Sequence, residues 1–177
     1  MSVAKLRKRC EEMRCIYINA ADIEAPLPPF LGGGGYLIEG GAGSTKSVMS
    51  LSLSGPGSSL VEVAPKATPK YKQVTIIPVA DVIDVDVFFF KLDVQGFEYD
   101  VLKGSEKLFT RKNVKTLQME VYPRGLHNAG TDVEAMLNYL WHDLGLFCST
   151  SLPESKRGEK FFEMDHPNSM QGFAEYL

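Results

Sequence analysis

Three acidic residues lie where a parallel sheet could gather them at one edge: Asp93, Glu98 and Glu120. Asp93 ends an apolar run typical of a strand, Glu98 begins the helical pattern that follows, and Glu120 lies near the end of the next predicted strand. Ligands of open α/β sheets bind outside the carboxyl ends of the strands. Carboxylates at such an edge can act as a general base, hold a ribose or amino group, or coordinate a cation. These three residues are therefore our candidate catalytic residues.

Each of these acids also has a structural explanation. Asp93 could cap a turn at Gly96 through backbone N–H groups. Glu98 could be a favourable charge in the first turn of a helix, and Glu120 could be a solvent-facing strand residue. Lys91 precedes Asp93 by two positions and so shares its face of the strand, which favours a counter-ion over a catalytic amine.

The histidines and cysteines form no recognisable motif. Their spacing fits neither a metal site nor a disulfide framework, and no Ser/His/Asp or Cys/His arrangement can be argued. We therefore expect no metal, and a reducing, cytoplasmic location. The residues concerned are His127, His142, His166, Cys10, Cys15 and Cys148.

A glycine-rich loop at residues 39–45 reads Glu-Gly-Gly-Ala-Gly-Ser-Thr. It is similar to the acid-x-Gly-x-Gly loops of nucleotide and S-adenosylmethionine sites. The residues that follow alternate Ser and Leu, so the helix N-terminus that would hold an anion is missing, as is the Gly-Lys-Ser/Thr of a P-loop. We favour a glycine hairpin turn, and the cofactor loop remains an alternative.

The elements that must position these residues change character near residue 73. Residues 15–72 are rich in Gly, Ser and Pro and indicate one strand followed by an insertion, whereas residues 73–177 alternate strand and helix patterns. This alternation predicts an α/β fold with a mostly parallel sheet in a single domain. The predicted strands are 15–21, 35–39, 48–53, 73–79, 85–93, 114–121, 146–150 and 160–164, and the predicted helices are 1–14, 98–109, 132–144 and 173–177. The near-continuous apolar run at 85–93 is typical of a strand covered on both faces.

Composition excludes several classes of protein. The chain has 177 residues, 44% hydrophobic and 23% charged, which is enough to bury a core and argues against disorder. The net charge of −3 shows no excess of positive charge of the kind that binds nucleic acid. No apolar run is long enough to span a membrane, and the basic residues near the N-terminus are not followed by the apolar region of a signal peptide.

Residues 90–104 read Phe-Lys-Leu-Asp-Val-Gln-Gly-Phe-Glu-Tyr-Asp-Val-Leu-Lys-Gly. This stretch resembles the core of the FkbM-type methyltransferase family, whose pattern is Lys-hydrophobic-Asp-hydrophobic-x-Gly-aromatic-Glu followed by Val-Leu-Lys-Gly. Residues 117–121 are similar to the family's next strand with its Glu, residues 58–60 to its Ser-Ser-Leu turn, and residues 17–21 to its third strand. The resemblance implies a Rossmann-like methyltransferase fold that is N-terminally incomplete here, because the first two strands would precede residue 1.

The resemblance implies an S-adenosylmethionine-dependent methyltransferase, and the reaction we expect is O-methylation of a sugar or metabolite hydroxyl. It places Asp93, Glu98 and Glu120 on the active-site rim and leaves the cofactor-binding residues unknown. The expected partner is a small-molecule or glycan acceptor, and we expect self-association through an exposed strand edge at residues 88–90. We also expect this chain alone to bind S-adenosylmethionine poorly. The alternatives are a catalytically silent α/β binding module and a nucleotide-binding protein that uses the glycine loop.

Overall fold

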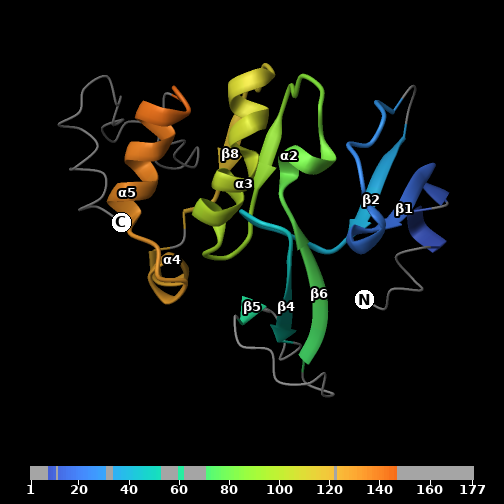
Figure 1. Ribbon diagram of the computed structural model, residues 1–177, viewed down its shortest axis with the longest axis horizontal. Helices are drawn as coiled ribbons and strands as arrows, with labels where there is room; N and C mark the ends of the chain where they lie inside the picture. The colour runs from blue at the N-terminus through green and yellow to red at the C-terminus, as the bar shows by residue number, and fades with distance from the viewer. Residues whose placement is uncertain are drawn as a thin grey trace, which may run out of the picture. The chain divides into compact units, whose positions relative to one another are not determined.

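The computed structural model describes residues 8–146, except for residues 11, 31–33, 53–59, 62–70 and 122 (Figure 1). The chain divides into two compact units, each described by itself. The first comprises the described residues of Met1–Phe90 and of Asp100–Leu117, and the second those of Lys91–Tyr99 and of Gln118–Leu177. The predicted single domain over residues 1–177 stays a prediction.

The elements follow one another as short strands and then mainly helices. They are β1 (Cys15–Asn19), η1 (Ala20–Asp22), β2 (Gly35–Glu39), β3 (Gly41–Ala42), β4 (Ser47–Ser52), β5 (Leu60–Val61), β6 (Tyr71–Ile77), α2 (Val79–Val82), β7 (Phe90–Leu92), α3 (Glu98–Arg111), β8 (Leu117–Met119), α4 (Pro123–Asn128), α5 (Val133–Asn138) and η2 (Tyr139–Asp143). Residues 8–10 and 12 are helical, and residues 1–7 of the helix expected at 1–14 lie outside the described residues. The strand expected at 160–164, the helix at 173–177 and all but residue 146 of the strand at 146–150 also lie outside them.

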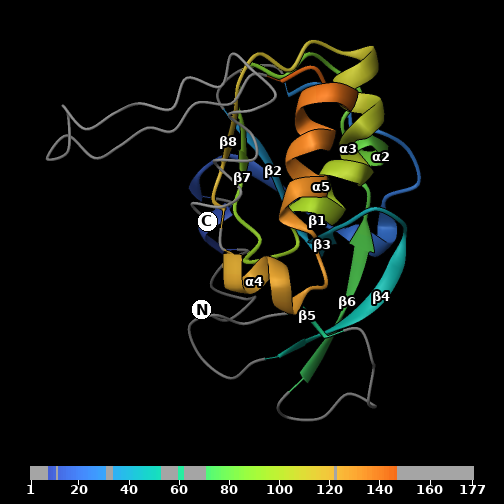
Figure 2. The same cartoon turned by 90° about the vertical axis from the view of Figure 1, so that its left-hand side faces the viewer.

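The described strands form three small sheets. β1 pairs with β2 in parallel, β7 pairs with β8, and the largest sheet has the order β3-β6-β4-β5. In that sheet β4 and β6 run antiparallel and lie side by side in both views (Figures 1 and 2), while β3 and β6 are parallel. The mixed α/β class is confirmed, and the Rossmann-like arrangement stays a prediction from the family pattern.

The first unit contains an aliphatic cluster to which the end of β6 contributes. Ala20, Ile23, Ile77 and Val82 are buried there. The backbone N–H of Leu27 donates to the carbonyl of Val82 at 2.8 Å, which ties the chain after η1 to α2. Burial of these side chains from water is the main force that holds the unit together.

Helix α3 packs closely on the glycine-rich loop in the same unit. A Cβ placed on Gly104 would lie 1.9 Å from the carbonyl oxygen of Gly43, so only glycine fits at this point of the helix. The carboxylate of Asp100 accepts a hydrogen bond from the backbone N–H of Ser44 at 3.0 Å. The Gly that ends the Val-Leu-Lys-Gly stretch is therefore explained by packing.

The second unit contains the helix predicted at 132–144. Asp132 caps α5 by accepting hydrogen bonds from the backbone N–H groups of Glu134 and Ala135. The helix continues as the π-helical η2, and its apolar face is buried at Met136, Leu137 and Leu140. The pattern of apolar residues three and four apart predicted this element correctly.

The strand predicted at 85–93 is much shorter in the structure. Only residues 90–92 form β7, and Val87 makes an isolated parallel bridge with Val114. Phe88 and Phe89 are 76% and 51% exposed, so the expectation that this run is covered on both faces is wrong for these two residues. Asp86 breaks the apolar run, and its carboxylate accepts a hydrogen bond from the N–H of Asn113 at 3.0 Å.

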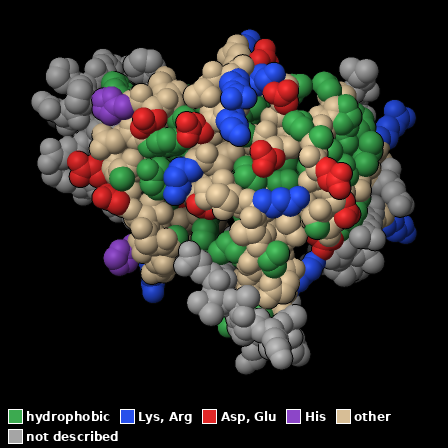
Figure 3. All heavy atoms as spheres, viewed as in Figure 1, with side chains coloured by type: hydrophobic (Ala, Val, Ile, Leu, Met, Phe, Trp, Pro, Cys, Tyr) green, Lys and Arg blue, Asp and Glu red, His purple; other side chains and the backbone are tan. Residues whose placement is uncertain are grey.

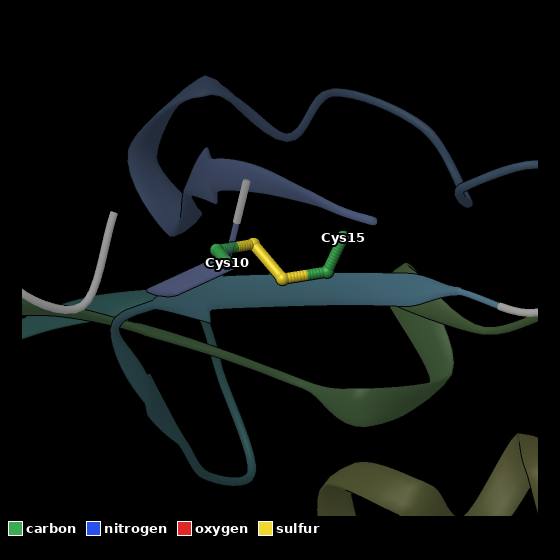
Figure 4. The surroundings of a disulfide bond; sticks show 2 residues. All are labelled: Cys10 and Cys15. Atoms are coloured by element: carbon green, nitrogen blue, oxygen red, sulfur yellow. A yellow bond between two sulfur atoms is a disulfide. The ribbon is translucent and has the colours of Figure 1, made fainter. Parts of the chain in front are cut away.

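Cys10 and Cys15 form a disulfide, which corrects the expectation of free cysteines (Figure 4). The chain reverses between them: the backbone N–H of Met13 bonds to the carbonyl of Arg9, and Arg14 adopts a left-handed φ of 56°. This turn brings the two Cα atoms to 4.9 Å, which a spacing of five residues does not reveal. The cysteines therefore no longer argue for a reducing compartment, and the cytoplasmic location stays a prediction.

Within the part of the chain that the structure describes, no helix has the length and apolar character to cross a membrane.

Candidate functional site

Two of the three predicted site residues follow paired strands, and both residues lie in the second unit. Asp93 comes directly after β7, and Glu120 comes directly after β8. The backbone N–H of Glu120 donates to the carbonyl of Leu92 at 3.1 Å, which continues the pairing of the two strands to their ends. The carboxyl ends of β7 and β8 therefore present Asp93 and Glu120 together, as the sequence predicts.

Gln95 links these two carboxylates. Its side-chain nitrogen Nε2 donates to Asp93 Oδ1 at 2.9 Å and to Glu120 Oε2 at 3.0 Å. An amide nitrogen carries two hydrogens, so both bonds can form at once. All three side chains are exposed, and the carboxylates form an open rim that a solute can reach.

The environment of Asp93 favours its ionised form. The hydrogen bond from Gln95 is the main reason why the pKa of Asp93 lies below its ordinary value. A small loss of hydration acts in the opposite direction, and Lys91 adds to the lowering of the pKa. Lys91 Nζ lies 3.5 Å from Asp93 Oδ2, which confirms the counter-ion expected for this pair. Asp93 is thus an anionic hydrogen-bond acceptor at neutral pH.

Glu98 has a different environment from the other two acids. Its side chain is fully buried, and its carboxylate accepts hydrogen bonds from the backbone N–H groups of Val94 at 3.3 Å and of Gly96 at 3.1 and 2.9 Å. Glu98, rather than Asp93, therefore caps the turn. This geometry supports a positioning role, in which Glu98 fixes the loop that carries Gln95, and a catalytic role for Glu98 stays a prediction.

The turn itself requires unusual backbone conformations. Gln95 and Gly96 have left-handed φ values of 54° and 112°. A Cβ on Gly96 would lie 2.4 Å from the backbone C and O atoms of Gly125 in α4, so glycine is needed both for its φ and for this close approach. Sequence reasoning missed Gln95, although its place between Asp93 and Gly96 was a usable signal.

The glycine-rich loop at residues 39–45 does not fit a nucleotide or S-adenosylmethionine cradle. The N–H of Gly43 donates to the carbonyl of Ile77 at 3.3 Å, and the N–H of Ser44 is bonded to Asp100, so both donors are used within the protein. The carboxylate of Glu39 is held by Tyr17 and Lys72. β4 follows the loop instead of a helix, so no helix N-terminus faces a phosphate.

The loop is not a hairpin turn either. β2 before it pairs with β1, and β3 within it pairs with β6, so the loop passes from one sheet to another. The glycines are needed because neighbouring atoms lie too close for a side chain. A Cβ on Gly40 would meet the Cβ of Ala20 at 2.4 Å.

Comparison with known proteins gives one family. The model of the Methyltransferase FkbM domain matches residues 5–147. No curated protein and no solved structure matches the chain. The matched residues include the turn at Asp93, the helix α3 and the strand β8. The chain therefore belongs to the FkbM methyltransferase domain family.

Proposed function

We propose that the chain acts in the S-adenosylmethionine-dependent methylation of a hydroxyl group on a sugar or another small metabolite. Membership of the methyltransferase family supports methyl transfer, and the methyl donor is the one that the family pattern implies. The observation that supports the hydroxyl acceptor is the exposed pair of carboxylates, Asp93 and Glu120, held by the single amide of Gln95. Carboxylate oxygens are strong acceptors for the O–H groups of a sugar.

In this proposal Asp93 orients the acceptor. A hydroxyl that donates a hydrogen bond to Asp93 has its oxygen lone pairs fixed in direction, and holding a reactant in one geometry is a large part of catalysis of group transfer. Because its pKa is lowered, Asp93 is a weak base, and we expect positioning to contribute more than early removal of the proton. The hydroxyl proton leaves through Asp93 to solvent as the oxygen gains the methyl group.

Glu120 provides the second contact. Gln95 engages its Oε2 at 3.0 Å, and the residue is exposed to solvent. Two carboxylates held by one amide nitrogen can accept hydrogen bonds from neighbouring hydroxyls of one molecule, as a sugar offers. The glycine-rich loop does not fit S-adenosylmethionine, so we assign no step to that loop, and the donor in this proposal follows from the family alone.

The test is transfer of an isotope-labelled methyl group from S-adenosylmethionine to a panel of monosaccharides by the full chain. We expect labelled product with at least one hydroxyl acceptor at a donor concentration high enough to offset the weak S-adenosylmethionine binding expected of this chain. Asp93→Asn should lower kcat/KM by about tenfold or more, since it removes the charge of the acceptor that orients the hydroxyl. Asp143→Asn, an exposed acid outside the rim, is the matched control and should leave the rate unchanged.

Two outcomes would contradict the proposal. The first is product formed equally by the wild-type chain and by Asp93→Asn. The second is binding of a sugar without any methyl transfer, which would instead support a binding module derived from a methyltransferase.

A further inference from the structure

A cavity of about 400 Å³ lies within the first unit, and none of its lining residues belongs to the carboxylate rim. We propose that this cavity binds a small organic anion, a carboxylate or a phosphate ester, with an apolar body. The volume lies within the range of small-molecule sites in proteins. The proposal does not depend on methyl transfer.

The cavity has an apolar wall. Ile23 after η1, Ile77 at the end of β6 and Leu108 in α3 contribute to it, and these side chains are 4%, 5% and 2% exposed. These nearly buried side chains form a closed apolar floor, against which a hydrocarbon or aromatic body can pack by dispersion contacts. The wall is therefore suited to the uncharged part of a ligand.

Two of the cations that line the cavity have no partner among the described residues. Lys107 and Arg111 both line it, and neither forms a hydrogen bond or ion pair with the residues that the structure describes. They lie four positions apart on α3, so their charges are neighbours on one helix face, where like charges repel. An anion between them would remove this repulsion, and the planar guanidinium of Arg111 can bind a carboxylate or phosphate through two parallel hydrogen bonds.

The other two cations of the lining are already engaged. Lys112 pairs with Asp84 at 3.0 Å, and Lys46 donates to the carbonyl of Ile23 at 3.2 Å. In Figure 3, Lys and Arg side chains gather beside Asp and Glu side chains on the upper part of the face shown, over the region that α2 and α3 occupy in Figure 1. Lys46 keeps its positive charge, because a carbonyl does not neutralise an ammonium group, but its Nζ is already engaged. Lys107 and Arg111 are the lining cations without a partner among the described residues.

Two acids restrict the ligand further. Glu24 and Asp81 also line the cavity, and they would repel a ligand with several negative groups. We therefore assign the site to a ligand with one anionic group attached to the apolar body. Cations at the C-terminal end of α3 also interact favourably with the helix dipole, and this structural role needs no ligand. The experiment below distinguishes the structural role from anion binding.

The experiment is calorimetric titration of the full chain with phenylacetate, phenyl phosphate and the uncharged phenylacetamide. We expect saturable binding of at least one anion, with a Kd lower than that of the amide by about tenfold or more. The affinity for the anion should fall at high salt, because salt screens the attraction between charges. Preference for phenylacetate would identify a carboxylate ligand, and preference for phenyl phosphate a phosphate ester.

The variant Lys107→Gln/Arg111→Gln should weaken binding of the preferred anion by about tenfold or more. Lys103→Gln, on the same helix but outside the lining, is the matched control and should bind as the wild-type chain does. Equal affinity for the amide and the anions would overturn the proposal. So would binding that is unchanged in the double variant, or absence of binding by either anion.

Discussion

Both carboxylate oxygens of Glu98 accept a hydrogen bond from the backbone N–H of Gly96, at 3.1 and 2.9 Å. This contact closes the turn between β7 and α3 on a fully buried acid. The exposed rim depends on that turn, since Gln95 lies within it and bonds to both rim carboxylates. A buried residue thus holds the geometry of an exposed site.

Replacement of Glu98 should therefore destabilise the fold. Glu98→Ala leaves the N–H groups of Val94 and Gly96 without their acceptor, which should cost about 2–3 kcal/mol of unfolding free energy. For a chain of this size that corresponds to a Tm lower by about 5–10 °C. Glu98→Gln keeps one acceptor oxygen and should cost less. Thermal unfolding followed by circular dichroism measures the Tm of both variants, and Glu134→Gln, at an exposed position, is the control. An unchanged Tm for Glu98→Ala would contradict the structural role of Glu98.

Replacement of Gln95 should raise the pKa of Asp93. Gln95→Asn is suited to this test, because Asn tolerates a left-handed φ while its shorter side chain cannot bridge the two acids. The ionised form of Asp93 is favoured in the folded chain, so its small contribution to stability is present above the ordinary aspartate pKa and lost as the pH falls through the lowered pKa. In the variant, both this loss and the acid limb of activity should move to higher pH.

Carboxyl-carbon NMR titration measures this pKa directly. The signal of Asp93 should titrate at a higher pH in Gln95→Asn than in the wild-type chain. An unchanged Asp93 titration would show that Gln95 is not its main partner.

The sequence predicted those features that depend on residues close together along the chain. The helix predicted at 98–109 is observed at 98–111, and the helix predicted at 132–144 is observed as α5 and η2 over 133–143. The pair Lys91 and Asp93 was also predicted, because alternate strand residues share a face. Each of these rests on local spacing.

Features that depend on distant contacts were missed or misjudged. Gln95 meets Glu120 across 25 positions, and no local pattern marks that contact. The apolar character of residues 85–93 predicted a long buried strand, but the exposed Phe88 and Phe89 show that composition alone does not decide which face is covered. The separation of Glu98 from the exposed rim also required the fold of the turn.

Gly104→Ala tests the packing of α3 on the glycine-rich loop. In an isolated helix this change would stabilise by about 1 kcal/mol, because alanine is the better helix former. Here the new Cβ would overlap the carbonyl oxygen of Gly43, so we expect a loss of about 1–3 kcal/mol instead. Gly35→Ala is the control, since no atom lies within 4 Å of its added Cβ. Denaturant unfolding measures both, and stabilisation by Gly104→Ala would show that α3 does not approach the loop.

The last prediction concerns the disulfide of Cys10 and Cys15. Arg14 lies between the two cysteines, so trypsin acting on the denatured, unreduced chain should release two peptides that remain joined and separate only on reduction. Mass spectrometry detects the joined mass. Because the bridge restricts the unfolded chain, Cys10→Ser/Cys15→Ser should lower stability by about 2 kcal/mol. Cys148→Ser is the matched control and should keep the joined peptides. The control for oxidation after purification is a chain whose free thiols are blocked during isolation. Two separate peptides from that chain in the absence of reductant would contradict the bridge.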